Sequence, residues 1–214
     1  LVLLAETITG WNNLMLLCSE AYLTGFYFKP RIDRDLLEAH NSGLIAINGH
    51  LGSELGDHLL AYVRNKSQTS WEAAEESIEW HKRVFADEGT GPRFFCEMQH
   101  HVPEQVSINP HVIELAKKHG VPLVCDNDAH FLRAEDHDAH DTLICISMGK
   151  NKHDEERMHY TPELYVKSPQ QMRELFEGEY GEDGAEACDN TLRIAARCDV
   201  ELPIGANHAP VVVV

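Results

Sequence analysis

The stretch FFCEMQHHVPEQVSINPHVIELAKKHGVPLVCDNDAH, residues 94–130, decides the fold class. Two short runs rich in apolar residues, Arg93–Met98 and Val121–Asp126, read as buried strands. Between them, the pair Asn109-Pro110 predicts the start of a helix, and Gly120 predicts its end. A strand, a helix and a strand in close succession predict a parallel β–α–β unit.

The same alternation continues toward the N-terminus. Leu1–Ala5 and Gly43–Asn48 read as two further buried strands. Apolar side chains that recur every three or four residues predict two amphipathic helices, one with Trp11, Leu14, Met15, Cys18 and Tyr22, the other with Trp71, Ala74, Ile78, His81 and Phe85. The sequence therefore predicts an α/β fold with parallel strands, which form either a doubly wound sheet or a barrel.

Capping signals place the remaining boundaries. Thr69 and Glu72 have the spacing of a capping box. Ser168–Gln171 has the same spacing and predicts the start of a helix over Gln170–Phe176. The acidic, glycine-containing Glu177–Gly184 reads as a loop between two C-terminal helices.

The two ends of the sequence read as parts of larger elements. Residues 1–201 are expected to form the domain, and residues 202–214, with Pro203, Gly205 and Pro210, an exit linker. A buried strand that starts at Leu1, and the β-branched run Val211–Val214, lead us to expect a portion of a longer chain that lacks its N-terminal strands.

The composition is that of one globular domain. The chain has 214 residues, 43% of them hydrophobic and 25% charged. It has no apolar run of the ~20 residues that a membrane span needs, and its first residues lack the pattern of a signal peptide, so neither a membrane protein nor a secreted precursor is expected. With 18 basic and 35 acidic residues the net charge is −17, which disfavours nucleic-acid binding by a basic face. Six cysteines without a CxxC pair fit a reduced, cytoplasmic setting.

Polar residues follow three of the predicted strands, where the functional loops of parallel α/β folds lie. His50 follows the first of these, between Gly49 and Gly52, which allow a sharp turn; the alternative is an exposed turn histidine. Glu97, with Gln99 and two histidines, follows the second strand, and it could equally be a salt-bridge or capping residue.

The third strand end is the most informative. In an extended chain Asp126, Asp128 and His130 share one face and could bind one metal ion or two adjacent ions; the alternative is a solvated loop. Aspartate and histidine donors without a thiolate suit zinc, manganese or iron in a reactive site. Ions of this kind activate water and neutralise phosphate charge, so phosphoester hydrolysis is the expected chemistry. No phosphate-binding loop and no GxSxG elbow is present.

A family resemblance spans residues 1 to about 202. Its motifs are LVLLAE, TGWNNLMLLCSEAYLTGFYFKPRID, GLIAINGHLGSE, the stretch quoted above, AHDTLICISMGK, LYVKSPQQMRELF and NTLRIAARCDVEL. In this order they resemble the PHP domain of the bacterial replicative DNA polymerase III alpha subunit. The resemblance implies a distorted seven-stranded β/α barrel with divalent metal ions at one mouth, here without its N-terminal strands. In many relatives the metal cluster is a three-prime to five-prime proofreading exonuclease; in others ligands are lost and the domain is structural.

Carried over by motif, Asp128 and His130 are the ligands of the family's NDxH signature, and His50 stands where a cysteine ligand is usual. These three are the predicted catalytic and metal-binding residues. The family's HxH pair and its other upstream ligands are absent from this sequence, so the site is incomplete. The implied partners are the rest of the polymerase chain, DNA through the complete polymerase and a proofreading subunit, without a membrane. The alternatives are a structural scaffold domain and a stand-alone PHP phosphoesterase.

Overall fold

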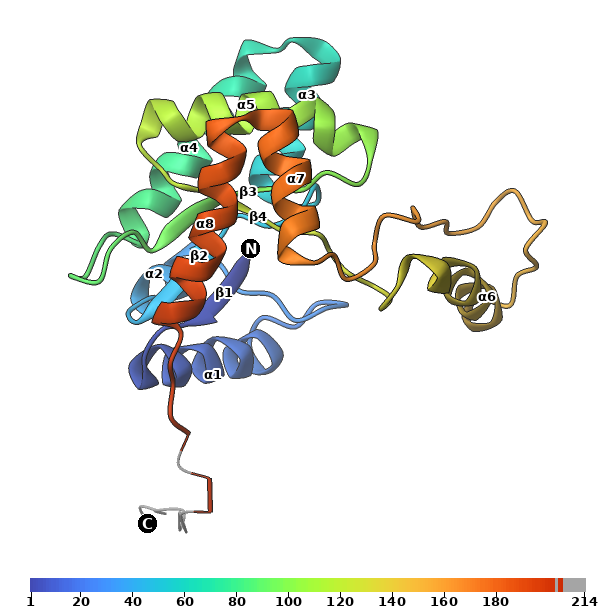
Figure 1. Ribbon diagram of the computed structural model, residues 1–214. Helices are drawn as coiled ribbons and strands as arrows, with labels where there is room; N and C mark the ends of the chain where they lie inside the picture. The colour runs from blue at the N-terminus through green and yellow to red at the C-terminus, as the bar shows by residue number, and fades with distance from the viewer. Residues whose placement is uncertain (203, 206–214) are drawn as a thin grey trace.

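The computed structural model describes residues 1–202, 204 and 205, in which helices cover a four-stranded sheet (Figure 1). The strands are β1 (Val2–Ala5), β2 (Leu44–Ile47), β3 (Phe94–Met98) and β4 (Leu123–Cys125). The helices are α1 (Ile8–Leu23), α2 (Arg34–Ala39), α3 (Glu54–Asn65), α4 (Gln68–Val84), α5 (Pro103–His119), a 3-10 turn η1 (Ala134–Asp136), α6 (His137–Met148), α7 (Pro169–Tyr180) and α8 (Glu182–Arg197). The four predicted strands are confirmed to within two residues.

The sheet is mixed, with the order β1-β2-β3-β4. β2, β3 and β4 are parallel, as expected, but β1 is antiparallel to β2, so the expectation of an all-parallel sheet is wrong. The reason is the connection between β1 and β2. It contains two helices, α1 and the unpredicted α2, and the second helix returns the chain to the end of the sheet at which β1 stops, where Ala5 lies opposite Leu44.

Both faces of the sheet are covered. The larger core packs on the face that carries Leu44, Phe94 and Leu123, against α3, α4, α5 and α7. On the opposite face, Ile45, Phe95, Val124 and Ile194 of α8 form a smaller buried cluster. The alternation along each strand follows the two-residue period of an extended chain, and it leaves the strand ends free to build a site.

Two helix starts differ from the predictions. α5 begins at Pro103, so Asn109-Pro110 lies inside the helix and does not cap it. The buried Asn109 amide instead donates to the carbonyl of Gln99 and to the hydroxyl of Tyr180. The proline removes the N–H that would pair with the carbonyl of Val106, a residue that is exposed, so water can satisfy this carbonyl.

The predicted capping box is also wrong. α4 begins after Ser67 instead of at Thr69, because Lys66, in the left-handed region at φ 50°, ends α3 and turns the chain sharply. The predicted helix after Ser168 is confirmed, with a capping box to Gln171.

The C-terminal boundaries shift as well. Glu177–Gly184 is not a loop, since α7 continues to Tyr180 and Gly181 alone separates it from α8. Gly181 has a φ of 59°, which a glycine adopts without strain and which lets one residue make the turn. The predicted linker 202–214 lies mostly outside the described residues. No helix in the described ranges is long and apolar enough to cross a membrane.

Gly10 lets α1 approach the start of β2 closely. A Cβ at this position would lie 1.8 Å from the carbonyl oxygen of Gly43, an immovable backbone atom. We expect Gly10→Ala to lower the free energy of unfolding by at least about 2 kcal/mol, measured by urea denaturation. The control is Gly178→Ala in α7, where a Cβ meets nothing within 4 Å and helix propensity favours alanine. Equal effects at the two glycines would contradict this account of the contact.

Candidate functional site

The carboxyl ends of β2, β3 and β4 lie side by side. β2 pairs with β3 and β3 with β4 in parallel, with Met98 opposite Cys125 at the ends of the last two strands. The loops that follow carry His50, the segment 99–102 and the segment 126–130. The sheet therefore places all three predicted strand ends along one edge.

His50 lies in a tight loop between β2 and α3. Gly49 has a φ of 89°, as the sequence predicted for a sharp turn at this position. The Nδ1 atom of His50 accepts a hydrogen bond of 2.9 Å from the backbone N–H of Gly52, and the side chain is exposed. Because Nδ1 is engaged, Nε2 is the nitrogen that remains free to bind a ligand.

Asp128 and His130 lie next to each other, but not for the predicted reason. β4 ends at Cys125, and the carboxylate of Asp126 accepts the backbone N–H groups of Asn127 and Asp128 in a local turn. Asp128 has a φ of 50°, which is unusual for a residue other than glycine. The alternation of an extended strand is therefore absent here. The turn still brings Asp128 Oδ1 to 3.4 Å from His130 Nε2.

Buried polar residues connect the three strand ends. The backbone N–H of the buried Glu97 donates to Asn48 Oδ1 at 2.5 Å. Gln99 Nε2 lies 3.4 Å from Asp126 Oδ2, and Gln105 of α5 donates to Gln99 Oε1 at 2.6 Å. These contacts fix the loops after β2, β3 and β4 relative to one another.

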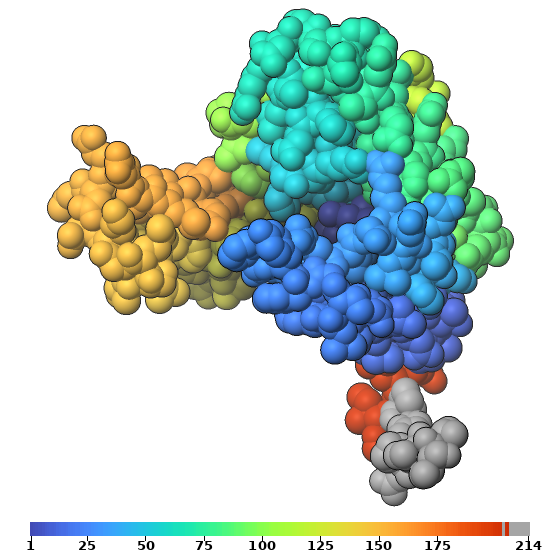
Figure 2. Space-filling view, turned by 180° about the vertical axis from the view of Figure 1, so that it is seen from behind, coloured from blue at the N-terminus to red at the C-terminus, as the bar shows by residue number. Residues whose placement is uncertain are grey.

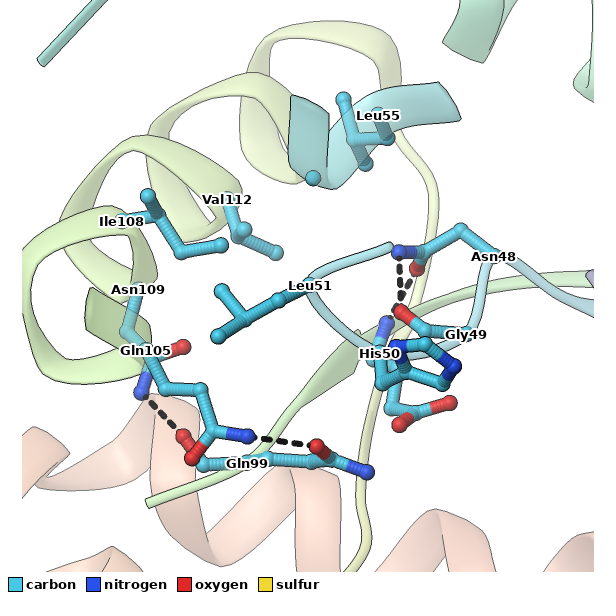
Figure 3. Close-up of a pocket in the computed structure, with 12 residues that line it drawn as sticks. Asn48, Gly49, His50, Leu51, Leu55, Gln99, Gln105, Ile108, Asn109 and Val112 are labelled. Carbon is cyan, nitrogen blue, oxygen red and sulfur yellow. Dashed lines mark hydrogen bonds between the residues drawn. The ribbon is translucent and has the colours of Figure 1, made fainter. Parts of the chain in front are cut away.

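A small cavity lies behind the loop of His50 (Figure 3). Its lining combines apolar side chains of α3 and α5 with the polar groups of Asn48, Glu97 and Gln99. Its volume of about 10 Å³ is close to that of one water-sized sphere. The cavity is too small for a substrate.

Two further residues face the Asp128–His130 turn, and the sequence analysis did not single them out. His101 Nδ1 is buried without a hydrogen-bond partner, and burial lowers the pKa of His101. The nearly buried Lys167 donates to Asn127 Oδ1 at 3.2 Å. His101 follows a predicted strand, which was the available signal, whereas Lys167 comes from a distant segment that no local pattern connects to β4.

The side chains fit a metal ion only in part. Over residues 1–202 and 204–205, no three His, Cys, Asp or Glu side chains gather closely enough to hold an ion. The adjacent carboxylate and imidazole of Asp128 and His130 supply two donors of the right chemistry. A complete site requires donors in addition to this pair, and the place of His50 among them stays a prediction.

Burial of Glu97 predicts a dependence of stability on pH. Burial, reinforced by the negative charge of Asp126, raises the pKa of Glu97 from 4.5 to about 7. The folded state therefore binds this proton more tightly than the unfolded state does, and stability falls as pH rises from about 4.5 to 7. The loss is on the order of 3 kcal/mol.

We expect Glu97→Gln to remove this loss. The variant should be more stable than the wild type at pH 8 and similar to it at pH 4.5, by urea denaturation at both values. An equal effect of the substitution at both pH values would show that ionisation of Glu97 is not responsible.

Comparisons with known proteins identify related sequences. Residues 1–101 match the family model described as PHP domain. The chain is 43% identical over 208 residues to "DNA polymerase III subunit alpha" of Thermus aquaticus, covering 96% of this chain and 16% of the relative. The proteins of the same name from Campylobacter jejuni and Borreliella burgdorferi are 39% and 38% identical, covering 98% and 93% of this chain and 17% and 16% of the relatives.

The similarity thus extends over nearly the whole chain, while the chain spans about one-sixth of the length of these curated relatives. The resemblance expected from the sequence motifs is confirmed. Residues 1–101 match the PHP domain family, and nearly the whole chain is homologous to part of the DNA polymerase III alpha subunit.

Proposed function

We propose that this chain is the PHP portion of a bacterial replicative DNA polymerase, and that its strand-end site serves phosphodiester hydrolysis in the longer protein. The similarity to alpha subunits across more than nine-tenths of the chain carries this proposal. The partners would be the rest of the polymerase chain, DNA bound by the complete polymerase and a proofreading subunit. A cytoplasmic location is part of the same proposal.

We also propose that the sheet is part of a seven-stranded barrel. An apolar cavity of about 310 Å³ lies on the α8 side of the sheet. Its lining is mostly apolar, with Glu97, Asp126 and Thr191 as its polar members; the apolar side chains are Val2, Leu4, Ile47, Val124, Cys125, Ile194, Ala195 and Cys198. Unfilled apolar space of this size beside a sheet supports the addition of strands, because their side chains would fill it.

The metal ligands in this proposal are His50, Asp128 and His130, acting with donors outside the described site. A divalent zinc, manganese or iron ion would supply an activated water and neutralise phosphate charge. The residues of this chain would contribute the following donors. Asp128 and His130 present a carboxylate and an imidazole from one turn, and the Gly52 N–H holds His50 with Nε2 free.

A scaffold without catalysis is the second candidate. The described residues bring together two predicted ligands and no third, which favours this alternative. A stand-alone phosphoesterase is the other alternative, and the similarity to alpha subunits along the whole chain weighs against it.

His50 can be tested as a replacement for the family's usual cysteine. In the longer protein we expect His50→Cys to keep the metal content of the wild type, because a thiolate is also a ligand for these ions. His50→Ala should lower metal affinity about 10-fold or more, since it removes a donor. Elemental analysis of the purified variants measures both. Equal metal in all three proteins would show that His50 is not a ligand.

The sequence of the parent gene separates the candidates. A reading frame that continues into a polymerase domain supports the proposal, and an upstream HxH pair with the further acidic and histidine ligands supports the nuclease over the scaffold. A gene that encodes a PHP domain alone would overturn the assignment to a polymerase.

A further inference from the structure

α1 is unusually poor in charge for this protein. Charged residues make up 25% of the chain, but Glu20 is the only one among the 16 residues of α1. A surface helix of a soluble domain normally carries charged residues on its outer face. The acidic surface of this protein is therefore interrupted along α1.

Apolar side chains occupy both sides of this helix. The inner side is buried against the sheet through Leu17 and Ala21. On the outer side, Ile8, Met15 and Tyr22 follow one another at intervals of seven residues and are 48%, 48% and 66% exposed. Such spacing places them along one stripe, which Leu16 and Leu23 widen. A helix that is apolar on both sides is typical of one that is covered on both sides.

The loop after α1 extends this stripe with three aromatic rings. Phe26, Tyr27 and Phe28 are exposed, Phe28 to 84%. Tyr27 and Phe28 pack edge to face at 4.6 Å. In Figure 2 the blue segment, which contains α1 and the loop after it, lies on the outside of the molecule.

Backbone contacts hold this loop in a defined conformation. A Cβ on Gly25 would lie 1.9 Å from the carbonyl oxygen of Arg31, so a glycine is needed to close the loop. The backbone N–H of Tyr27 donates to the carbonyl of Lys29 at 3.1 Å, and Phe28 has a φ of 60°. Holding a phenylalanine in this strained conformation exposes its ring in a defined position.

Charged residues follow the aromatic residues in the sequence. Lys29, Arg31 and Asp33 are exposed, and the guanidinium of Arg31 lies 4.9 Å from the centre of the Tyr27 ring. An apolar centre with aromatic, methionine and arginine residues and a polar rim is the composition of a protein–protein interface. Nucleic acid would need more cations than Lys29 and Arg31 beside a protein of net charge −17.

We propose that the outer side of α1 and the loop Gly25–Ile32, together the α1-loop surface, are covered by another part of the same longer polypeptide. This inference rests on the proposed function, in which the chain is part of a polymerase. The relatives whose names identify them as alpha subunits have 82% to 86% of their length outside the region matched here. An apolar surface of this extent is rarely left exposed in a protein that stays monomeric.

Hydroxyl-radical footprinting of side chains tests this proposal directly. The longer protein and the 214-residue chain are labelled under identical conditions and digested for mass spectrometry. We expect Met15, Tyr22 and the rings of Phe26–Phe28 to react about tenfold more slowly in the longer protein, because burial excludes the radical. Leu192 of α8, which is 70% exposed and lies outside the surface, serves as the internal control and should react equally in both.

A double variant tests whether protection from labelling comes from the proposed contact with the α1-loop surface. The double substitution Met15→Glu and Leu23→Glu should leave the thermal unfolding of the 214-residue chain unchanged, because both side chains are exposed there. In the longer protein it should restore labelling of Phe26–Phe28, and Leu192→Glu should not.

Equal labelling in the two wild-type proteins would overturn the proposal while leaving the polymerase assignment intact. Concentration-dependent protection in the 214-residue chain alone, with dimers in sedimentation, would identify a second copy as the occupant and also overturn it. A parent gene without a polymerase domain would instead overturn the proposed function, and this proposal with it.

Discussion

Arg197→Met is expected to lower the free energy of unfolding by about 3–5 kcal/mol. Arg197 near the end of α8 pairs with Glu6, which follows β1, with Nε and Oε1 2.9 Å apart. The side chains are 17% and 6% exposed, so water does little to screen the pair. Arg197 also donates to the carbonyl of Pro92 at 2.6 Å, which joins a third segment to this contact. Methionine would leave the carboxylate of Glu6 buried without its cation.

Urea denaturation of the wild type and variants measures this loss. The matched control is Arg83→Met, which breaks the exposed pair of Arg83 with Glu38 and should leave stability close to that of the wild type. Adding Glu6→Gln to Arg197→Met should recover part of the loss, since it removes the stranded charge. A loss from Arg197→Met no larger than that of the control would contradict the role of the buried pair.

The same pair predicts sensitivity to acid. Burial alone would raise the pKa of Glu6, but hydrogen bonds from Arg197 and Thr90 and the charge of Arg197 hold this pKa below its usual 4.5. A lowered folded-state pKa stabilises the protein above the unfolded-state value, and the stabilisation is lost as pH falls through the folded-state pKa. This acid-induced loss should be smaller in Arg197→Met.

The 214-residue chain by itself is expected to show no appreciable exonuclease activity and to bind metal weakly. Hydrolysis requires ions and an activated water held in fixed geometry. The described residues gather the Asp128–His130 pair and no third donor. The net charge of −17 would also repel a DNA end whose phosphates are not neutralised.

Single-stranded DNA labelled at its five-prime end, with manganese or zinc added, serves as the substrate, and gel electrophoresis measures trimming. The His130→Ala variant is the control for contaminating nucleases, since they would trim the DNA equally in both samples. Metal-dependent trimming by the wild type that His130→Ala abolishes would show that the ligands within this chain suffice.

The sequence predicted the strands well because each is a short apolar run bounded by turn residues, and β3 is buried along its whole length. The predictions from the sequence failed where tertiary contacts determine where an element begins or which way it runs. Asn109-Pro110 has the pattern of a helix start, but the Asn109 amide is used by Gln99 and Tyr180, and the helix begins earlier. The direction of β1 depends on α2, a helix of six residues that is too short to show a clear periodicity.

The sequence predicted the functional site about as well as it predicted the fold. Motif and strand-end position led to Asp128 and His130, and the structure places the two side chains together. The left-handed conformation of Asp128 was not predictable, because it depends on the carboxylate of Asp126 accepting two backbone N–H groups. Lys167 was missed because it approaches Asn127 across 40 residues of sequence.

The most direct test of the central claim is the metal content of the longer protein, with and without the Asp128–His130 pair. Elemental analysis after extensive dialysis should find tightly bound divalent metal in the wild type. The double variant Asp128→Ala and His130→Ala should lose most of it, while circular dichroism remains that of the wild type. Equal metal in both proteins, or none in the wild type, would contradict the assignment of these strand ends as a metal site.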